Sequence, residues 1–324
     1  MVVNRKFVLN KVNLRQTIDM KTSKGIKLFA PSCISLLSYG LRDISIAINR
    51  PGNEILAKLN MDNNDIIFNT YSKEKDDTKG IKDIVLKFAK QFKTKTKSSR
   101  GVLFDIFNRI PFNMGLGELE ANITGVIFAL NNILNTHFEN KDIFNFIIET
   151  AQEFNLDILQ SNVAANIFGG IILYNNNLHH PVQKLYAPLG LNLTIIEKRN
   201  KIDNTIFDNT DAQELFEQSK NNAGFIKSLF TTDHDLLANS LKYNVFDDKI
   251  AANINWYKDV KSISYNNEVY SIGFSHYGET VFIINPNTHI RDENNKEILQ
   301  YFKNKGIKAK LIETEINLNG IFVY

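Results

Sequence analysis

The strongest helical signal in the sequence begins at Leu119, directly after a loop that contains two closely spaced glycines. Apolar residues recur there at intervals of three and four, the spacing of one helix face; they are Leu119, Ile123, Val126, Ile127, Leu130, Ile133 and Leu134. The loop, Ile110–Gly117, would bring backbone N–H groups to the helix start, where they and the helix dipole favour a phosphate. Because a Gly-x-Gly turn before a helix is also common as a purely structural feature, the loop alone leaves both interpretations open.

The remaining periodicities predict strands and helices that do not alternate regularly. Strands are expected at 26–29, 43–49, 102–108, 171–174, 191–196, 269–273, 281–284, 308–313 and 320–324. Helices are expected at 81–92, 119–135, 141–154, 211–230, 235–243 and 297–304. Pro51-Gly52 is expected to form a turn after the second strand. A mixture without regular βαβ alternation favours an α+β fold over a doubly wound sheet.

Composition narrows the class of function. The chain is 43% hydrophobic and 23% charged, as in a globular protein with a core, and its 324 residues suggest two domains or one large one. Its 38 basic and 35 acidic side chains are scattered, whereas a nucleic-acid binder gathers basic residues on one face. No apolar run approaches the roughly 20 residues of a membrane span. Cys33 is the only cysteine, which excludes an intrachain disulfide and fits a reducing compartment.

Several segments resemble one group of kinases, and they occur in that group's order. Pro-x-x-x-Gly-Leu-Gly from Pro111 to Gly117, followed by Ala121, is similar to the phosphate-binding motif of the GHMP kinases. Asn162–Gly170 resembles the Asp-Asn-Val-Ala-Pro segment and later Gly-Gly pair of the homoserine kinases in that superfamily. Further similarities to the same family lie at Lys27–Ser32 with Gly40, at Arg50–Ile55 and at Gly273–Phe282.

The resemblance implies a two-lobed α+β fold and a reaction. After an extension, residues 1–24, the N-terminal lobe would comprise residues 25–195, resemble ribosomal protein S5 domain 2 and bind ATP. The C-terminal lobe, residues 196–324, would be ferredoxin-like. The implied reaction transfers the γ-phosphate of ATP, with Mg²⁺, to the hydroxyl of L-homoserine on the route to threonine. A cytoplasmic homodimer without a nucleic-acid or membrane partner is expected.

The same resemblance implies residues for the nucleotide and the substrate. The nucleotide would contact Pro111, Met114, Gly115, Leu116, Gly117, Glu118, Leu119, Ser275 and Gly278. Asn162 and Ser161 would lie at the catalytic centre. Arg199 would bind the substrate carboxylate, and Asp43 would bind its ammonium group, because each charge needs an opposite partner.

The metal ligands are expected at Glu149 and Glu118. Glu149 matches an acidic position of the family by its spacing back from Asn162. Glu118 and Leu119 stand where the family has two serines. Two roles are open for Glu118, and for Glu120 nearby. A carboxylate at a helix start is stabilised by the dipole but repels phosphates, whereas a bridging Mg²⁺ would make it a ligand.

Other departures from the family pattern keep alternative functions open. Leu36 and Arg42 replace an asparagine and an aspartate, so Asp43 would reach the ammonium group only if its loop slips by one residue. Ser161 replaces an aspartate, and a second arginine expected near Asp247–Lys249 is absent. The alternatives are therefore a GHMP kinase for another small alcohol and a non-catalytic pseudokinase that serves as a binding or structural subunit.

Overall fold

The computed structural model describes residues 25–36, 39, 41–62, 64–72, 78–198, 211–275 and 280–324. Its strands are β1 (Gly25–Leu36), β2 (Leu41–Asn60), β3 (Ile66–Ser72), β4 (Gly101–Asn108), β5 (Ile171–Tyr174), β6 (Val182–Leu185), β7 (Asn192–Glu197), β8 (Ser271–Ser275), β9 (Thr280–Asn285), β10 (Lys310–Glu315) and β11 (Phe322–Val323). Its helices are α1 (Thr78–Lys95), α2 (Glu118–Leu134), α3 (Asn140–Glu153), α4 (Gln160–Phe168), α5 (Ala212–Thr231), α6 (His234–Lys242), α7 (Asp247–Ala251), α8 (Tyr257–Asn266) and α9 (Thr288–Asn304). The mixture confirms the α+β expectation.

Strands β1 to β6 and β11 form the first sheet, whose main path runs β11-β1-β2-β4-β3. The long strand β2 pairs with β1 along most of its length, with β5 near its start and with β4 near its end. The turn expected at Pro51-Gly52 is wrong, because β2 continues through both residues and Gly52 lies opposite Pro31. A glycine is required at position 52 for packing, because the ring of Phe29 occupies the space that a Cβ at this position would need.

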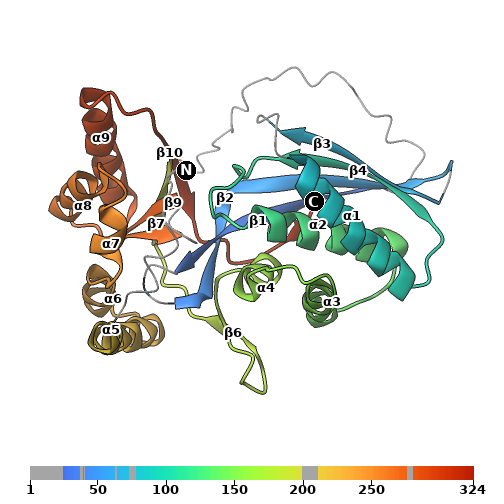
Figure 1. The fold of residues 1–324 in the computed structure, drawn as a ribbon, viewed down its shortest axis with the longest axis horizontal. Coiled ribbons are helices and arrows are strands. Elements are labelled where there is room, and N and C mark those ends of the chain that lie inside the picture. Colours follow the sequence, from blue (N-terminus) through green and yellow to red (C-terminus); the bar gives the residue numbers. More distant parts are fainter. Residues whose placement is uncertain are drawn as a thin grey trace, which may run out of the picture.

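Helices α1 to α4 cover one face of the first sheet (Figure 1). Helix α2 packs closely on β1 and β2, because a Cβ at Gly125 would overlap the side chain of Ile55 and approach Ala30. Close helix–sheet packing of this kind needs a residue without a side chain. The contact fixes the height of α2 above the sheet, and with it the position of the glycine loop that precedes the helix.

The second sheet has the order β10-β7-β9-β8 and is antiparallel throughout. Strand β7 joins two cores: Leu193 and Ile195 belong to the core shared with the first sheet, and Ile196 belongs to the core near α8 and α9. The chain ends back on the first sheet, where β11 pairs with β1 (Figure 1). The expected boundary between residues 195 and 196 falls inside β7, and the division into lobes 25–195 and 196–324 stays a prediction.

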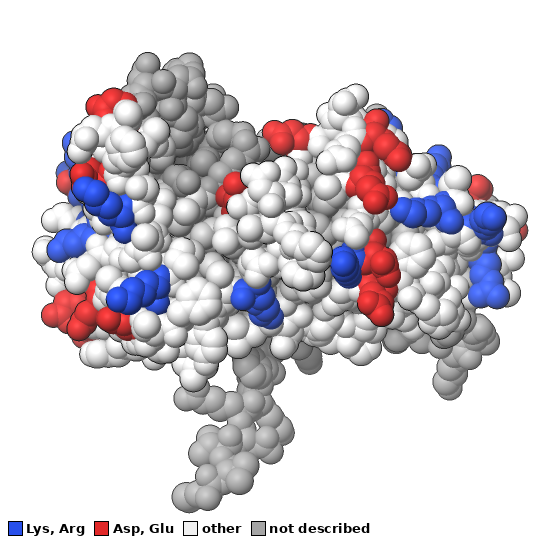
Figure 2. All heavy atoms as spheres, turned by 90° about the horizontal axis from the view of Figure 1, so that it is seen from below, with Lys and Arg blue, Asp and Glu red and all other residues white. Residues whose placement is uncertain are grey.

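Charged side chains of both signs are interspersed on the face shown in Figure 2, rather than gathered in one patch of a single sign. Among the described residues, no helix combines the length and the apolar character that crossing a membrane requires.

Candidate active site

A pocket of about 530 Å³ opens where the glycine loop meets the first turn of α2. Its walls come from the start of α1, the loop before α2, the first turn of α2, and the connection from α3 into α4. The lining residues are Gly80, Ile81, Ile84, Pro111, Phe112, Asn113, Met114, Gly115, Leu116, Gly117, Glu118, Leu119, Glu120, Asp157, Leu159 and Asn162. The structure therefore brings together the predicted nucleotide contacts from Pro111 to Leu119 and the predicted catalytic residue Asn162.

Two hydroxyl groups of the second sheet hold the glycine loop. Ser275, the last residue of β8, donates from Oγ to the carbonyl oxygen of Gly115 at 2.7 Å and accepts from the N–H of Ser35 at 3.2 Å. Thr280, the first residue of β9, donates to the carbonyl oxygen of Met114. Ser275 thus lies at the loop, as expected, but its hydroxyl is bonded to backbone groups. Its direct contact with a nucleotide stays a prediction.

Strand β1 holds the next carbonyl group of the loop, because the N–H of Cys33 donates to the carbonyl oxygen of Leu116 at 3.0 Å. In a trans peptide the C=O and the N–H point to opposite sides. The carbonyl groups of Met114, Gly115 and Leu116 are all held by the protein, so the N–H group in each of these peptides, that of Gly115, Leu116 and Gly117, points away from its carbonyl's partner. A run of N–H groups at a helix N-terminus binds anionic oxygens.

The start of α4 carries both predicted catalytic residues beside this loop. Ser161 and Asn162 are 2% and 3% exposed. The Oγ of Ser45, in β2, lies 2.8 Å from both Ser161 Oγ and Asn162 Oδ1, and its single proton serves one acceptor at a time. Sequence reasoning missed Ser45. Its place between Ile44 and Ile46 was a usable signal, because alternation along a strand turns it away from those apolar side chains.

Three acidic residues line the pocket, Glu118, Glu120 and Asp157, and none of its described lining residues is Lys or Arg. The Oε1 of Glu120 accepts the N–H of Leu159 at 3.1 Å. Burial raises the pKa of the Glu120 carboxyl and the charge of Asp157 adds to this, although hydrogen bonds from Leu159 and Asn162 oppose it. Among the described residues no three His, Cys, Asp or Glu side chains form a metal site.

Glu149 is separated from the other predicted site residues. Its side chain is 60% exposed on α3, and its Oε2 pairs with the Nζ of Lys95 in α1 at 3.1 Å. It is not among the residues that line the pocket. The position gives no support to Glu149 as a metal ligand, and this role stays an unsupported prediction.

Of the two predicted substrate-binding residues, Asp43 lies among the described residues and Arg199 does not. Asp43 is exposed near the start of β2, two residues before Ser45 and therefore on the same face of the strand. The same face of β2 carries the hydroxyl group of Ser45, which contacts Ser161 and Asn162 at the start of α4. Arg199 and Gly278 lie outside the described residues.

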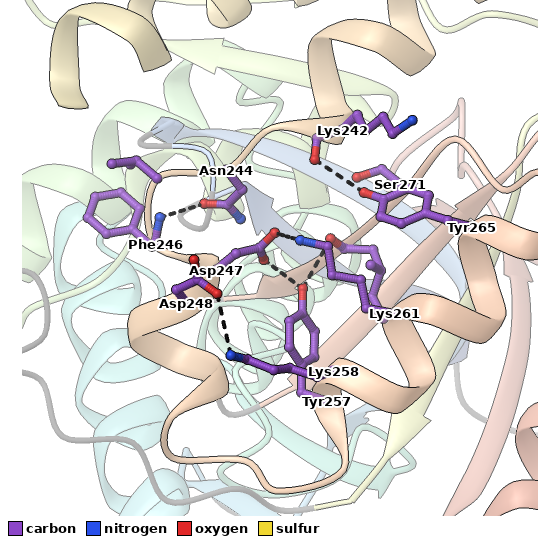
Figure 3. Close-up of polar contacts among 12 residues, drawn as sticks. Lys242, Asn244, Phe246, Asp247, Asp248, Tyr257, Lys258, Lys261, Tyr265 and Ser271 are labelled. Carbon is purple, nitrogen blue, oxygen red and sulfur yellow. Dashed lines mark hydrogen bonds and ion pairs between the residues drawn. The ribbon is translucent and has the colours of Figure 1, made fainter. Parts of the chain in front are cut away.

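The region expected to hold a second arginine is a closed polar network (Figure 3). Asp247 accepts from the hydroxyl of Tyr257 at 2.6 Å and pairs with Lys261. Burial raises the pKa of Asp247, and the charge of Lys261 opposes the shift. Lys249 pairs with Glu214 at 3.1 Å. Both lysines are already engaged with carboxylates, so they support the lobe rather than offer a site for a substrate carboxylate.

No known family model matches the chain. The chain is 23% identical over 304 residues to the homoserine kinase of Methanococcus vannielii, covering 90% of this chain and 100% of that protein. The structure of homoserine kinase from Cytophaga hutchinsonii matches with a TM-score of 0.82 and 20% identity, over 99% of this chain and 100% of that one. The mevalonate kinase of Methanococcus jannaschii matches with a TM-score of 0.65 and 15% identity, over 92% and 99%.

The fold is that of the GHMP kinases, a superfamily of small-molecule kinases, as expected. The relatives that the chain resembles by sequence are homoserine kinases, and a homoserine kinase is also among its structural neighbours.

Proposed function

We propose that the chain is an ATP-dependent kinase that transfers the γ-phosphate of ATP to the hydroxyl of L-homoserine. The observation that carries the proposal is the row of N–H groups from Gly115 to Gly117, held in place at the N-terminus of α2 beside the pocket. Use of ATP follows from the relation to kinases, and the names of the relatives point to homoserine. The names of these relatives give no support to the alternative of a non-catalytic pseudokinase subunit.

In this proposal the phosphates lie on the N–H groups of the glycine loop, and Asn162 and Ser161 lie beside the transferred phosphoryl group. Phosphoryl transfer depends mainly on positioning and on neutralising charge. Hydrogen-bond donors that are fixed before the substrate binds stabilise developing charge without having to reorganise. The N–H groups of the loop meet this condition, because β1, β8 and β9 fix the carbonyl groups between them.

Mg²⁺ fits the chemistry of the pocket lining. A nucleoside triphosphate would bring negative charge to a pocket whose described lining holds Glu118, Glu120 and Asp157 but no basic side chain. A close pair of like charges costs about 4 kcal/mol at an intermediate dielectric, so binding of the anion calls for a cation. Mg²⁺ commonly takes one or two carboxylates together with phosphates, and we assign Glu118 to it. Bound Mg²⁺ would neutralise charge on the phosphate oxygens.

The substrate is proposed to lie along the face of β2 that carries Asp43 and Ser45. Homoserine has an ammonium group and a carboxylate, and a specific site pairs each with an opposite charge. With its hydroxyl near Asn162, the ammonium group would lie toward Asp43. Arg199 is the proposed partner of the carboxylate. A homodimer in the cytoplasm stays a prediction.

The proposal is tested by the melting temperature and by the release of ADP. MgATP and L-homoserine are each expected to raise the melting temperature, because a ligand at 100 times its dissociation constant stabilises a protein by about 2.7 kcal/mol. ADP should be released only when both are present. A shift with MgATP but no ADP release with homoserine would point to a different alcohol. No shift with MgATP would contradict the kinase itself.

Arg199→Leu is expected to weaken homoserine binding by about 10- to 150-fold, since a hydrogen bond to a charged group contributes roughly 1.5–3 kcal/mol. The dissociation constant for MgATP should stay unchanged. Titration calorimetry with each ligand measures both values. Arg100→Leu, at an exposed position between α1 and β4, is the control and should bind both ligands normally. An unchanged homoserine dissociation constant in Arg199→Leu would rule out this role.

A further inference from the structure

Glu120 connects the first turn of α2 to the start of α4. Its side chain is buried, its Oε1 accepts the N–H of Leu159, and its carboxylate also accepts a hydrogen bond from the side-chain amide of Asn162. Leu159 is the N-cap residue of α4 and has no side-chain capping bond of its own. Glu120 therefore supplies, from a neighbouring helix, the carboxylate that holds the end of α4 on which Asn162 lies.

The two ends of the Asn162 amide face different partners. Its Oδ1 lies 2.8 Å from the Oγ of Ser45, which can donate a proton to it. Its Nδ2 lies beside the glycine loop, where a Cβ at Gly117 would be only 3.2 Å away. The oxygen of an asparagine amide accepts hydrogen bonds and the nitrogen donates two, whereas an ionised carboxylate only accepts. Glu120 therefore favours the orientation in which Nδ2 faces the carboxylate and the loop.

We propose that Glu120 is a positioning residue that makes Asn162 present an N–H group, rather than a carbonyl oxygen, to phosphate oxygens bound at the glycine loop. One proton of Nδ2 goes to Glu120, and the other remains for an anionic oxygen in the pocket that Asn162 lines. The inverted amide would turn its oxygen toward the same phosphate and repel it. Because Glu120 acts at the nucleotide site, the inference rests on the proposed function.

Glu120→Gln tests this role because the new side chain has the same size but carries an amide nitrogen that can donate. Its oxygen can still accept from Leu159, while its nitrogen lets the Asn162 amide invert. We expect the dissociation constant for MgATP, measured by calorimetry, to rise about tenfold, the size expected for a lost hydrogen bond to a charged group. The KM for ATP should rise, whereas the KM for homoserine and the melting temperature should change little.

Repeating the Glu120→Gln change in a variant that lacks the Asn162 amide separates positioning of that amide from general damage to the structure. In Asn162→Ala, the further change Glu120→Gln should alter the MgATP dissociation constant less than about twofold, because the amide through which it acts is gone. Equal effects in both backgrounds would overturn the proposal. Glu153→Gln, at an exposed position at the end of α3, is the matched control and should bind MgATP as the unchanged chain does.

Glu120→Asp keeps an acceptor on a shorter side chain and should retain most of the affinity that Glu120→Gln loses. If Glu120→Gln does not fold, Glu120→Asp must still bind MgATP more tightly than Asn162→Ala, or the proposal fails. An unchanged chain that binds no MgATP would overturn the proposed function and this inference together. An unchanged chain and a Glu120→Gln variant that bind MgATP equally well would overturn this inference alone.

Discussion

Gly117→Ala is expected to abolish measurable MgATP binding while lowering the free energy of unfolding by only about 1–2 kcal/mol. Gly117 has a φ of 70°, a left-handed conformation that a side chain disfavours. The added Cβ would lie 3.2 Å from Asn162 Nδ2, so the loop or the Asn162 side chain has to shift by a few tenths of an ångström at the place proposed for the phosphates. Calorimetric titration with MgATP measures the effect on binding, and thermal unfolding measures the effect on stability.

Gly306→Ala is the matched control for the backbone conformation. Gly306 has a φ of 66°, and a Cβ there would meet nothing within 4 Å. Its replacement should lower stability by a similar amount, because the left-handed conformation carries the same penalty, but MgATP binding should be unaffected. Equal MgATP affinity in Gly117→Ala and Gly306→Ala would place the phosphates elsewhere than on the row of N–H groups.

Helix α2 was predicted to within one residue at each end, because its sequence pattern and its environment agree. The helix was expected at 119–135 and lies at Glu118–Leu134. Its apolar stripe packs into the core, as such a stripe does in a globular protein. The glycine loop ahead of it was found for the same reason, since a strong helix start makes the preceding turn visible in the sequence.

Helix α4 was not predicted, because it has no polar face. Seven of its nine residues are buried, among them Ser161, Asn162 and Asn166. Asn166 donates to the carbonyl oxygen of Pro31 at 2.7 Å, so a polar side chain points into the protein. A periodicity argument needs apolar residues on one side and polar residues on the other. The short strands β3 and β6 were missed as well.

The supports of the site depend on contacts between distant parts of the chain. Thr280 lies 166 residues from Met114, whose carbonyl group it holds, and nothing near Met114 in the sequence indicates this partner. The link from Ser45 to Asn162 likewise spans 117 residues. The sequence alone can therefore indicate a loop suited to phosphates. The directions of its N–H groups depend on how the two sheets pack.

Glu118→Ser is expected to weaken MgATP binding by at least about tenfold, by comparison with the 10- to 100-fold losses seen when groups that merely support metal ligands are removed. Glu118 is the first residue of α2, lines the pocket and is 8% exposed. Without its carboxylate, more Mg²⁺ should be needed for half-maximal ADP release. The lost carboxylate at the helix start should cost only about 0.3–1 kcal/mol of stability.

Glu118→Gln separates the charge of this residue from its size, and it should weaken MgATP binding as Glu118→Ser does if the carboxylate binds the metal. Tighter MgATP binding in the two variants would instead indicate that the Glu118 carboxylate repels the phosphates. If Glu118 only repels the phosphates, both variants should bind MgATP more tightly and release ADP faster, because a close like-charge pair of about 4 kcal/mol is removed. A Mg²⁺ titration of homoserine-dependent ADP release distinguishes the two. Tighter binding with an unchanged Mg²⁺ requirement would show that the metal is held by other groups and that Glu118 opposes the nucleotide.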